Sequence, residues 1–387
     1  MATIVQKNRD YVTPATALKM LKMIMRHNLN LAVFNPKTGE WTEHTDHNRY
    51  LIPCLWAPPG VGKTAVVHQA ANELREEMHL AQYNVLVEKL AIKEPTEVGG
   101  YPYPDKETMT FSHIIAKKWR DFSTAPGVAF LDEYAQGNIS QQNGGRNITN
   151  ERKCGDYDLC PGTTIVAASN MMENKAGTSA MPTQAKDVFT HLYIQPEAKE
   201  WAAWAMAKGL NPLVPSFIYE LGAEYLCPAL DTSAGSENAQ PSPRSWERVH
   251  EILSMPWDLS DRSEYAAQRT LVSGTVGPVA AGQFYTHVEL MHKLPDKEDV
   301  LAGRKLGKKL DTKNSGIMCL FSMILAANAR PDNLTHLVKW CRELEAQEYG
   351  SLIMNMVRHI DKKLSSHPAV VEWFVKNESN LMLGGAK

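Results

Sequence analysis

The chain has 387 residues, of which 43% are hydrophobic and 22% are charged. This composition is typical of a soluble globular protein, and the length predicts two or three folding units instead of one core. The net charge of −2 provides no overall positive field that would attract DNA. No apolar run is long enough to cross a membrane, and the first residues contain no signal-peptide core, so we expect a cytoplasmic protein.

Helical and apolar segments alternate over the first half of the chain. Residues 11–28 have the spacing of an amphipathic helix, and the polar, turn-rich residues 29–50 predict a hairpin. Short apolar runs separated by helical stretches predict five buried strands. These runs are residues 50–56, 83–90, 127–133, 163–170 and 188–194. Alternating strands and helices predict a parallel sheet that is covered on both faces.

The pattern changes after Pro196, where helical segments are broken by glycine and proline. Residues 197–208, 215–225 and 244–253 have helical character, whereas the small, polar and proline-rich residues 228–243 predict a loop. We therefore expect an α/β first part that is followed by a helical second part.

A glycine-containing loop joins the first of the five predicted strands to the next helix. It reads Ala57-Pro58-Pro59-Gly60-Val61-Gly62-Lys63-Thr64, which matches the pattern G-x-x-x-x-G-K-[ST] except that Ala57 replaces the first glycine. Small residues let the backbone curl around a phosphate with its N–H groups pointing inward, and the helix N-terminus adds favourable potential. We expect ATP to be bound here by Pro59, Gly60, Val61, Gly62, Lys63, Thr64 and Ala65.

Roles for two residues of this loop follow from the chemistry of phosphoryl transfer. Lys63 is expected to reach the β- and γ-phosphates and to take part in catalysis, and the hydroxyl of Thr64 is expected to ligate Mg²⁺. The alternative is a Gly-rich turn without function, but a buried strand before the loop and a helix after it favour nucleotide binding.

Polar residues end two of the later strands. Asp132 and Glu133 follow an apolar run, and Asn170 ends the next one. The carboxyl ends of parallel strands lie beside the phosphate loop in such sheets, so we expect Asp132 to hold the Mg²⁺ shell. Glu133 would orient or deprotonate the attacking water, and Asn170 would hold the water or the γ-phosphate. Solvent-exposed strand ends are the alternative reading.

Arg244 lies in the segment Pro241-Ser242-Pro243-Arg244-Ser245-Trp246-Glu247, at the start of a predicted helix. An arginine at this point could reach a phosphate across an interdomain cleft, or it could be an ordinary surface residue. Spacing alone does not choose between these readings.

The order of these elements resembles that of AAA+ ATPases, and of the MoxR group in particular. Two further stretches carry the resemblance: residues 92–102 (IKEPTEVGGYP) and residues 176–192, which contain Ala176-Gly177, Met181-Pro182 and Phe189-Thr190-His191-Leu192. The resemblance is to the single-chain MoxR-like proteins of phages and bacteria. It implies the sensor 1 role for Asn170 and the sensor 2 role for Arg244, where the latter would contact ATP.

The resemblance also implies a fold, a domain plan and an activity. The fold would be an AAA+ P-loop NTPase with a parallel five-stranded sheet flanked by helices, a small helical lid and a helical extension. The four regions would be residues 1–49 (N-terminal helix and hairpin), 50–196 (nucleotide domain), 197–275 (lid) and 276–387 (extension). Members hydrolyse ATP, assemble as rings, usually hexamers, and remodel partner proteins, often ones with a von Willebrand factor A domain. A phage-encoded member would work as a chaperone in the host cytoplasm.

One position departs from the family. An arginine finger precedes the phenylalanine that corresponds to Phe189, and Val188 occupies that position here. Such a finger accounts for several orders of magnitude in turnover. Lys186, Lys175, Arg146 and Arg152 are candidates to replace it in trans, although a lysine does not reproduce the planar fork of arginine. We therefore also consider an ATP-dependent scaffold or switch with weak turnover.

Two other segments carry alternative readings. Residues 304–309 (RKLGKK) predict a solvated basic helix face, and the alternative is a nucleic-acid contact by a DNA-directed AAA+ motor or loader. Residues 138–157 would, by resemblance, form a helix and loop facing the ring pore. The Gly144-Gly145 pair breaks a regular helix there, either as a mobile pore element or as a plain kink.

Overall fold

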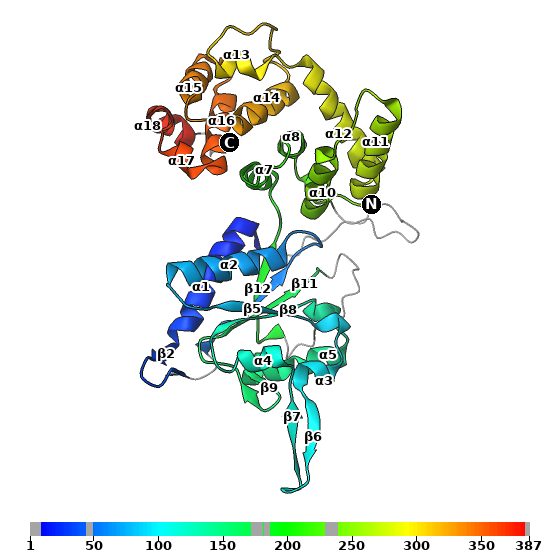
Figure 1. The fold of residues 1–387 in the computed structure, drawn as a ribbon, viewed down its shortest axis with the longest axis vertical. Coiled ribbons are helices and arrows are strands. Elements are labelled where there is room, and N and C mark those ends of the chain that lie inside the picture. Colours follow the sequence, from blue (N-terminus) through cyan, green and yellow to red (C-terminus); the bar gives the residue numbers. More distant parts are fainter. Residues whose placement is uncertain (1–8, 44–48, 172–180, 182–185, 229–238, 384–387) are drawn as a thin grey trace. The chain divides into compact units, whose positions relative to one another are not determined.

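The computed structural model describes residues 9–43, 49–171, 181, 186–228 and 239–383, with side chains up to residue 377. The chain divides into two compact units, Met1–Gln195 and Pro196–Lys387, and each is described by itself (Figure 1). None of the described helices combines the length and the apolar character that a bilayer crossing requires.

The first unit is built on a parallel sheet of six strands. Their order is β1-β12-β4-β11-β8-β5, and every neighbouring pair within it is parallel. The bounds are β1 Tyr11–Val12, β4 Pro53–Trp56, β5 Asn84–Lys89, β8 Gly127–Asp132, β11 Thr164–Ser169 and β12 Thr190–Ile194. All residues of β4, β8 and β11 are buried, as expected of central strands that are covered on both faces.

The predicted number of strands was wrong by one. Residues 11 and 12 were assigned to the first helix, but they form β1, which pairs with Tyr193 and Ile194 at the edge of the sheet. The helix itself, α1 (Pro14–Asn30), starts after Thr13, whose hydroxyl accepts a hydrogen bond from the Thr16 N–H at 3.3 Å. Pro14 suits the first helical position because it lacks the N–H that would have no partner there.

Helices cover both faces of the sheet. On one face α1 packs against α2 (Lys63–Glu77) and both contact the strands, as Figure 1 shows. The other face buries Cys54, Trp56 and Leu131 together with Trp119 and Tyr134 from the segments that follow β5 and β8. These segments contain η2 Leu90–Ile92, α3 Pro95–Gly99, α4 Lys117–Asp121, η3 Tyr134–Gln136, α5 Ile139–Gly144 and the π-helix η4 Asn147–Glu151. The predicted class, a parallel sheet flanked by helices with a helical region after it, is confirmed.

Three antiparallel hairpins extend from this unit. The predicted N-terminal hairpin is β2 (Ala32–Asn35) with β3 (Glu40–Glu43). A second, β6 (Tyr101–Asp105) with β7 (Thr110–Ile114), protrudes as a long ribbon in Figure 1. A third, very short hairpin joins β9 (Lys153–Cys154) to β10 (Tyr157–Asp158).

The segment 138–157 is more broken than one helix and a loop. The helix α5 ends at Gly144, and η4 follows as a separate π-helix. A Cβ at Gly144 would lie 3.2 Å from the Pro95 carbonyl oxygen, and one at Gly145 would lie 3.4 Å from Leu90 and Tyr134 side-chain carbons. The glycine pair therefore also allows close packing of α5 against α3 and η2.

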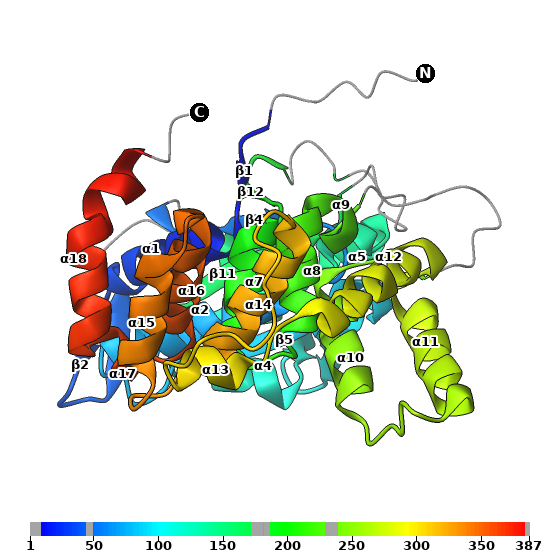
Figure 2. The same ribbon diagram turned by 90° about the horizontal axis from the view of Figure 1, so that it is seen from above.

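The second unit is helical throughout its described residues. Its helices are α7 Ala198–Ala207, α8 Leu213–Leu221, α9 Ala223–Leu226, α10 Pro243–Ser254, α11 Arg262–Val276, α12 Pro278–Val288, η6 Glu289–Lys293, α13 Lys297–Leu301, α14 Ser315–Ala327, α15 Leu334–Glu343, α16 Gln347–Ile360, α17 Lys362–Ser365 and α18 Pro368–Leu383. In Figure 2, α10 and α11 form a helical hairpin, and they contact each other along their length. One core gathers around Phe217, Trp246 and Phe284, and another around α14 and α16. The division of this unit into a lid and an extension stays a prediction.

The basic stretch 304–309 is not a helix face, which corrects the prediction. It is a loop after α13, since α13 ends at Leu301 and α14 begins at Ser315. Gly303, in the left-handed region with φ +69°, ends the helical turn. Arg304 pairs with Asp299 at 3.2 Å, and Lys308 donates to the His292 carbonyl at 2.6 Å.

Candidate functional site

The phosphate loop leaves the buried strand β4 at Trp56 and enters α2 at Lys63. Gly60 and Gly62 have φ values of +78° and +92°, in the left-handed region that a side chain disfavours. Gly62 is the N-cap of α2, and no side chain caps this helix end. No side chain therefore occupies the N-terminal end of α2, as an anion-binding helix N-terminus requires.

Lys63 lies across its own loop. Its Nζ donates to the carbonyl oxygens of Ala57 at 3.1 Å and Pro58 at 3.4 Å. It also donates to Oδ1 of Asn170 at 2.8 Å, so the ammonium group joins the loop to the end of β11. The structure thus brings together two residues that the sequence predicted to share a site, although 107 positions separate them.

Thr64 and Asp132 form the second link between the loop and the sheet. The Thr64 hydroxyl donates to Oδ2 of Asp132 at 3.2 Å, and Asp132 is 9% exposed at the end of β8. Mg²⁺ takes oxygen ligands and is usually held by one or two protein oxygens together with phosphates and water. A hydroxyl and a carboxylate side by side fit that donor set.

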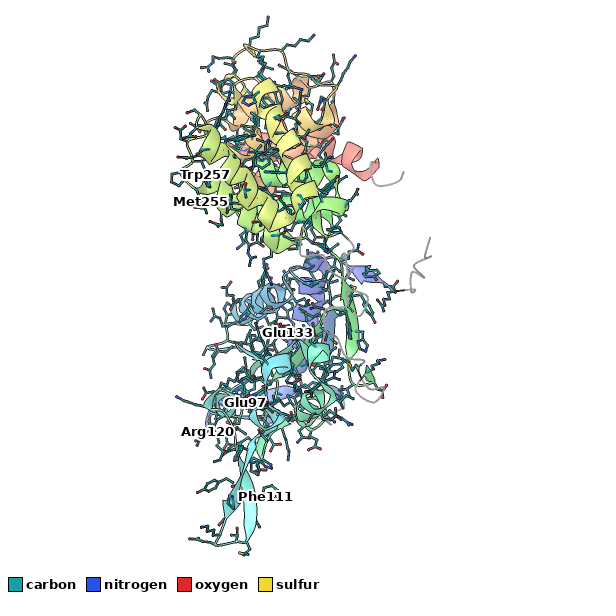
Figure 3. The ribbon with its side chains drawn as sticks, turned by 90° about the vertical axis from the view of Figure 1, so that its right-hand side faces the viewer. Glu97, Phe111, Arg120, Glu133, Met255 and Trp257 are labelled. Carbon is teal, nitrogen blue, oxygen red and sulfur yellow. The ribbon has the colours of Figure 1, made fainter. Side chains whose placement is uncertain are left out.

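Glu133 follows Asp132 in an unusual backbone conformation. Its φ of 57° and ψ of 34° lie in the left-handed region, which costs a non-glycine residue about 1 kcal/mol or more. The Glu133 N–H donates to Oδ1 of Asp132 at 3.0 Å, and its carbonyl accepts from Gln136 and Gly137. Glu133, labelled in Figure 3, is half-buried directly after the end of β8. Strain at this position is a mark of functional sites.

Ser169 is a residue of this site that the sequence reasoning missed. Its side chain is fully buried, and its Oγ accepts a hydrogen bond from the Ala135 N–H at 3.0 Å. Its carbonyl accepts from the Ala57 N–H at 3.3 Å, at the start of the phosphate loop. The end of β11 therefore holds both the loop and the turn after Glu133. A serine directly after the apolar run of residues 165–168 was the available signal.

The strand that carries the loop is also linked to the segment before β12. The Trp56 indole N–H donates to Nδ1 of His191 at 2.8 Å, and Nε2 of His191 lies 3.1 Å from the Lys186 carbonyl. Because Nδ1 accepts, the proton lies on Nε2, which donates to Lys186. We call this chain of two hydrogen bonds the Trp56–His191 link. The Phe189 N–H donates to the same carbonyl at 3.2 Å.

The four candidates for the trans-acting cation have different surroundings. Arg152 is 3% exposed, its guanidinium lies 3.6 Å from the ring centroid of Tyr50, and its Nη2 donates to the Thr163 carbonyl at 2.9 Å. It is buried inside its own unit, so its candidacy was wrong. Arg146 is half-buried, and Lys186 is exposed two positions before Val188. Lys175 lies outside the described residues.

Arg244 belongs to the second unit and is exposed in the first turn of α10. Ser242 caps this helix by accepting from the Ser245 N–H at 3.1 Å, and Trp246 anchors it through a 2.7 Å hydrogen bond to the Tyr225 carbonyl. This anchoring fixes the helix end while leaving the Arg244 side chain accessible. Its role toward ATP stays a prediction.

Comparison with known proteins gives distant structural likeness. No protein-family model and no curated protein matches the chain. The replication initiator DnaA bound to AMPPCP and single-stranded DNA is 13% identical with a TM-score of 0.38, covering 95% of this chain and 89% of that chain. AMPPCP-bound DnaA from Aquifex aeolicus is 12% identical with a TM-score of 0.37, covering 97% and 90%. A RuvB mutant from Thermotoga maritima is 12% identical with a TM-score of 0.32, covering 95% and 89%.

Likeness at this level carries no argument about substrates or partners. The fold is defined instead by features of the chain itself. The phosphate-loop strand β4 lies between β11 and β12, and the Asp132 strand β8 lies next to β11. With the loop–helix junction at Gly62 and the helical second unit, this arrangement is an α/β fold in which a parallel sheet flanked by helices precedes a helical region.

Proposed function

We propose that this chain binds ATP with Mg²⁺ and hydrolyses it as an AAA+ ATPase that acts on a partner protein. The observation that carries the proposal is the pair of contacts from adjacent loop residues to two neighbouring strand ends. Lys63 reaches Asn170 at 2.8 Å, and Thr64 reaches Asp132 at 3.2 Å. Two such contacts put a cation, a hydroxyl, a carboxylate and an amide around the same helix N-terminus.

Each of these side chains has a role in the proposed reaction. Lys63 would exchange its contacts to loop carbonyls for the β- and γ-phosphate oxygens, while Pro59 to Ala65 wrap the phosphates. Thr64 and Asp132 would hold Mg²⁺, which when bound supplies positive charge against the phosphate oxygens. Glu133 would orient and deprotonate the attacking water, and Asn170 would hold that water or the γ-phosphate. Arg244 would contact ATP from the helical unit.

We propose that several copies assemble, as a hexameric ring, and that Lys186 supplies the cation of the neighbouring site. Val188 has no charge to offer, Arg152 is buried, and Lys186 is exposed. The Trp56–His191 link holds the Lys186 carbonyl at 3.1 Å, which fixes the backbone from which this lysine extends. An ammonium group lacks the planar fork of arginine, so we expect slower turnover than an arginine finger would support.

The partner is proposed from the MoxR resemblance to be a protein that the ATPase remodels or loads, for example one with a von Willebrand factor A domain. The loop form of residues 304–309 weakens the DNA-motor alternative. Arg304 is paired with Asp299, and Lys308 is bonded to a carbonyl. Salt-sensitive DNA binding at low ionic strength would restore that alternative.

The proposal is tested by measuring the assembly mass with and without ATP and Mg²⁺, followed by turnover on the same samples. We expect nucleotide-dependent assembly and a specific activity that rises with protein concentration. The scaffold alternative predicts assembly with turnover that stays at background, and Val188 is the observation that motivates it. If the chain neither assembles nor binds ATP, both the ATPase proposal and the scaffold alternative are contradicted.

A further inference from the structure

The ribbon formed by β6 and β7 exposes an unusual amount of apolar surface. Figure 1 shows it protruding from the first unit, and Figure 3 shows Phe111 on it. Five of its large apolar side chains are more than half exposed: Tyr101 64%, Tyr103 58%, Met109 88%, Phe111 63% and Ile114 56%. Single exposed apolar residues are ordinary, but a group on one element marks an interaction surface.

Apolar groups lie on both faces of the ribbon. Successive side chains on a strand point to opposite faces, and directly paired residues share a face. The pairing of Tyr101 with Ile114 therefore defines one face, which also carries Tyr103. The pairing of Pro104 with Phe111 defines the other, where Phe111 and His113 pack edge to face at 5.4 Å. The ribbon is thin, so neither face has a core behind it.

The β6 edge of the ribbon has no main-chain donors at its outward positions 102 and 104. The His113 N–H donates to Oδ2 of Asp156 at 2.6 Å, so it points away from β6. In an antiparallel pair, the main-chain groups of two directly opposite residues either both point toward the partner strand or both point away from it. The main-chain groups of Pro102, opposite His113, therefore also point outward. Two positions along, those of the pair Phe111 and Pro104 point outward as well. Both prolines thus occupy the outward positions of β6, where each removes a donor without weakening the ladder. Along the β6 edge a partner therefore meets side chains and no main-chain donors at these positions.

The base of the ribbon is held tightly. Nδ1 of His113 also lies 2.9 Å from Oδ1 of Asp156 in the β9–β10 turn. A Cβ at Gly100 would lie 2.9 Å from the His113 Cβ, and one at Gly155 would lie 2.8 Å from it. These close approaches need glycine, and they fix the ribbon against the third hairpin. The apolar surface is therefore presented in one preformed arrangement, which lowers the entropic cost of binding.

The charge of the ribbon and its exposed apolar area indicate which kind of molecule binds to it. The ribbon itself, residues 101–114, contains two carboxylates (Asp105, Glu107) and one lysine (Lys106), so it has no basic surface that would attract a phosphate backbone. The five side chains offer on the order of 600 Å² of exposed surface, since a large apolar side chain has about 150–250 Å². A stable interface buries about 800 Å² on each partner, so this surface suits a transient contact better than a second copy of the chain.

We propose that the β6–β7 ribbon is the docking element for the partner protein, and that it binds an apolar, non-acidic polypeptide segment through side chains on both faces. The inference rests on the proposed function in one respect, that the bound polypeptide belongs to the protein that the ATPase remodels. Binding itself requires no nucleotide.

The test uses the full chain and fluorescence anisotropy with three labelled probes. These are a short flexible peptide that alternates leucine or phenylalanine with lysine or serine, the same peptide with glutamate in place of lysine, and a single-stranded oligodeoxynucleotide. The variant Y103S/F111S removes one aromatic side chain from each face. Met255→Ser, at an apolar position of the other unit that is 46% exposed, is the matched control.

We expect the basic apolar peptide to bind best and Y103S/F111S to weaken it about tenfold or more, while Met255→Ser changes little. Equal binding by wild type and Y103S/F111S would overturn the proposal, as would preference for the oligonucleotide. If the double variant does not fold, Phe111→Ser alone is used, and we expect a smaller loss.

A second variant, P102V/P104V, tests the claim about the edges. Restoring two outward donors should leave peptide affinity within about twofold and should promote self-association of the chain. A large gain in peptide affinity, with no effect of Phe111→Ser, would mean that the main chain is the binding element and the proposal is wrong. ATP turnover is measured in parallel. Normal turnover without peptide binding defeats only this inference, and peptide binding without turnover defeats only the proposed function.

Discussion

The phosphate-loop end of the sheet and the β6–β7 ribbon belong to one unit but differ in what their side chains contact. At the loop end, hydrogen bonds hold side chains from one helix and the ends of two strands: Lys63 to Asn170, Thr64 to Asp132, and Ser169 to the main chain of Ala135. On the ribbon, the aromatic side chains extend into solvent, and its described polar contacts lie mainly at its turn and its base. In our proposals the first region binds a small polar ligand and the second binds an apolar peptide.

This difference predicts which property a substitution in each region will change. Changes at the loop end alter chemistry that depends on positions within a fraction of an ångström. Changes on the ribbon alter a surface that no core depends on, so catalysis should tolerate them. Five substitutions or conditions test this contrast, in order of decreasing expected effect.

Lys63→Ala should remove the cation that bridges the loop and Asn170. We expect turnover to fall at least about a hundredfold, since a preorganised charge of this kind is worth that much in other enzymes. Lys106→Ala, in the turn of the ribbon, is the matched control and should leave turnover unchanged. Steady-state phosphate release measures both. Unchanged turnover in Lys63→Ala would refute the ATPase assignment.

Glu133→Gln keeps the shape of the side chain but removes its basicity. We expect hydrolysis to fall by about two orders of magnitude or more, while ATP affinity stays within a few fold. Single-turnover assays with equilibrium binding separate the two quantities. If both fall together, Glu133 serves to bind nucleotide and is not the base.

His191→Ala should cut the Trp56–His191 link and release the Lys186 carbonyl. We expect turnover to fall about tenfold with ATP affinity nearly unchanged, because the residue positions a neighbour's cation and not the phosphates. Glutamine at position 191, which can both accept and donate, should recover part of the loss. A plain loss of stability without a change in turnover per folded molecule would show that the link is only structural.

Acid should loosen the base of the ribbon. Hydrogen bonds from the His113 side chain and main chain lower the pKa of Asp156. A carboxylate with a lowered pKa stabilises the folded state fully above its unfolded pKa of about 3.9, and this contribution is lost as the pH falls through the folded value. We expect the His113 amide to exchange faster below that point. Asp156→Asn should show the faster exchange already at neutral pH.

Met109→Gly should have the smallest effect. Met109 is 88% exposed at the ribbon turn and has a φ of 55°, which glycine adopts without strain. We expect the melting temperature to change by no more than a few degrees, in the upward direction, with turnover unchanged. A clear decrease would mean that the methionine side chain packs against something in solution.

The sequence predicted those parts of the fold that depend on continuous patterns. The central strands are unbroken apolar runs, and the phosphate loop has a fixed spacing, so both were located within a few residues. The short β1 was missed because two residues are too few to show the alternation of a strand. They directly precede the helix that begins at Pro14, and the helix prediction included them. The ribbon was missed because Tyr101-Pro102-Tyr103-Pro104-Asp105 contains two prolines, which normally argue against a strand.

The candidate site was predictable for strand ends but not for contacts between distant segments. Asp132 and Asn170 could be named because parallel strands share one carboxyl edge. The burial of Arg152 depends on Tyr50 and Thr163, and the Trp56–His191 link joins residues 135 positions apart. Such pairs have no signature in a single sequence, because only the folded topology brings them together.

The most direct test of the account mixes two variants that are each expected to turn over ATP slowly. Lys63→Ala retains Lys186, and Lys186→Ala retains the phosphate loop, so mixed assemblies contain sites in which both residues are present across a subunit boundary. We predict that each variant alone turns over ATP slowly and that the mixture recovers activity above the sum of the two. A mixture that assembles but shows no recovery would contradict the claim that ATP is hydrolysed at a site completed by Lys186 of a neighbouring copy.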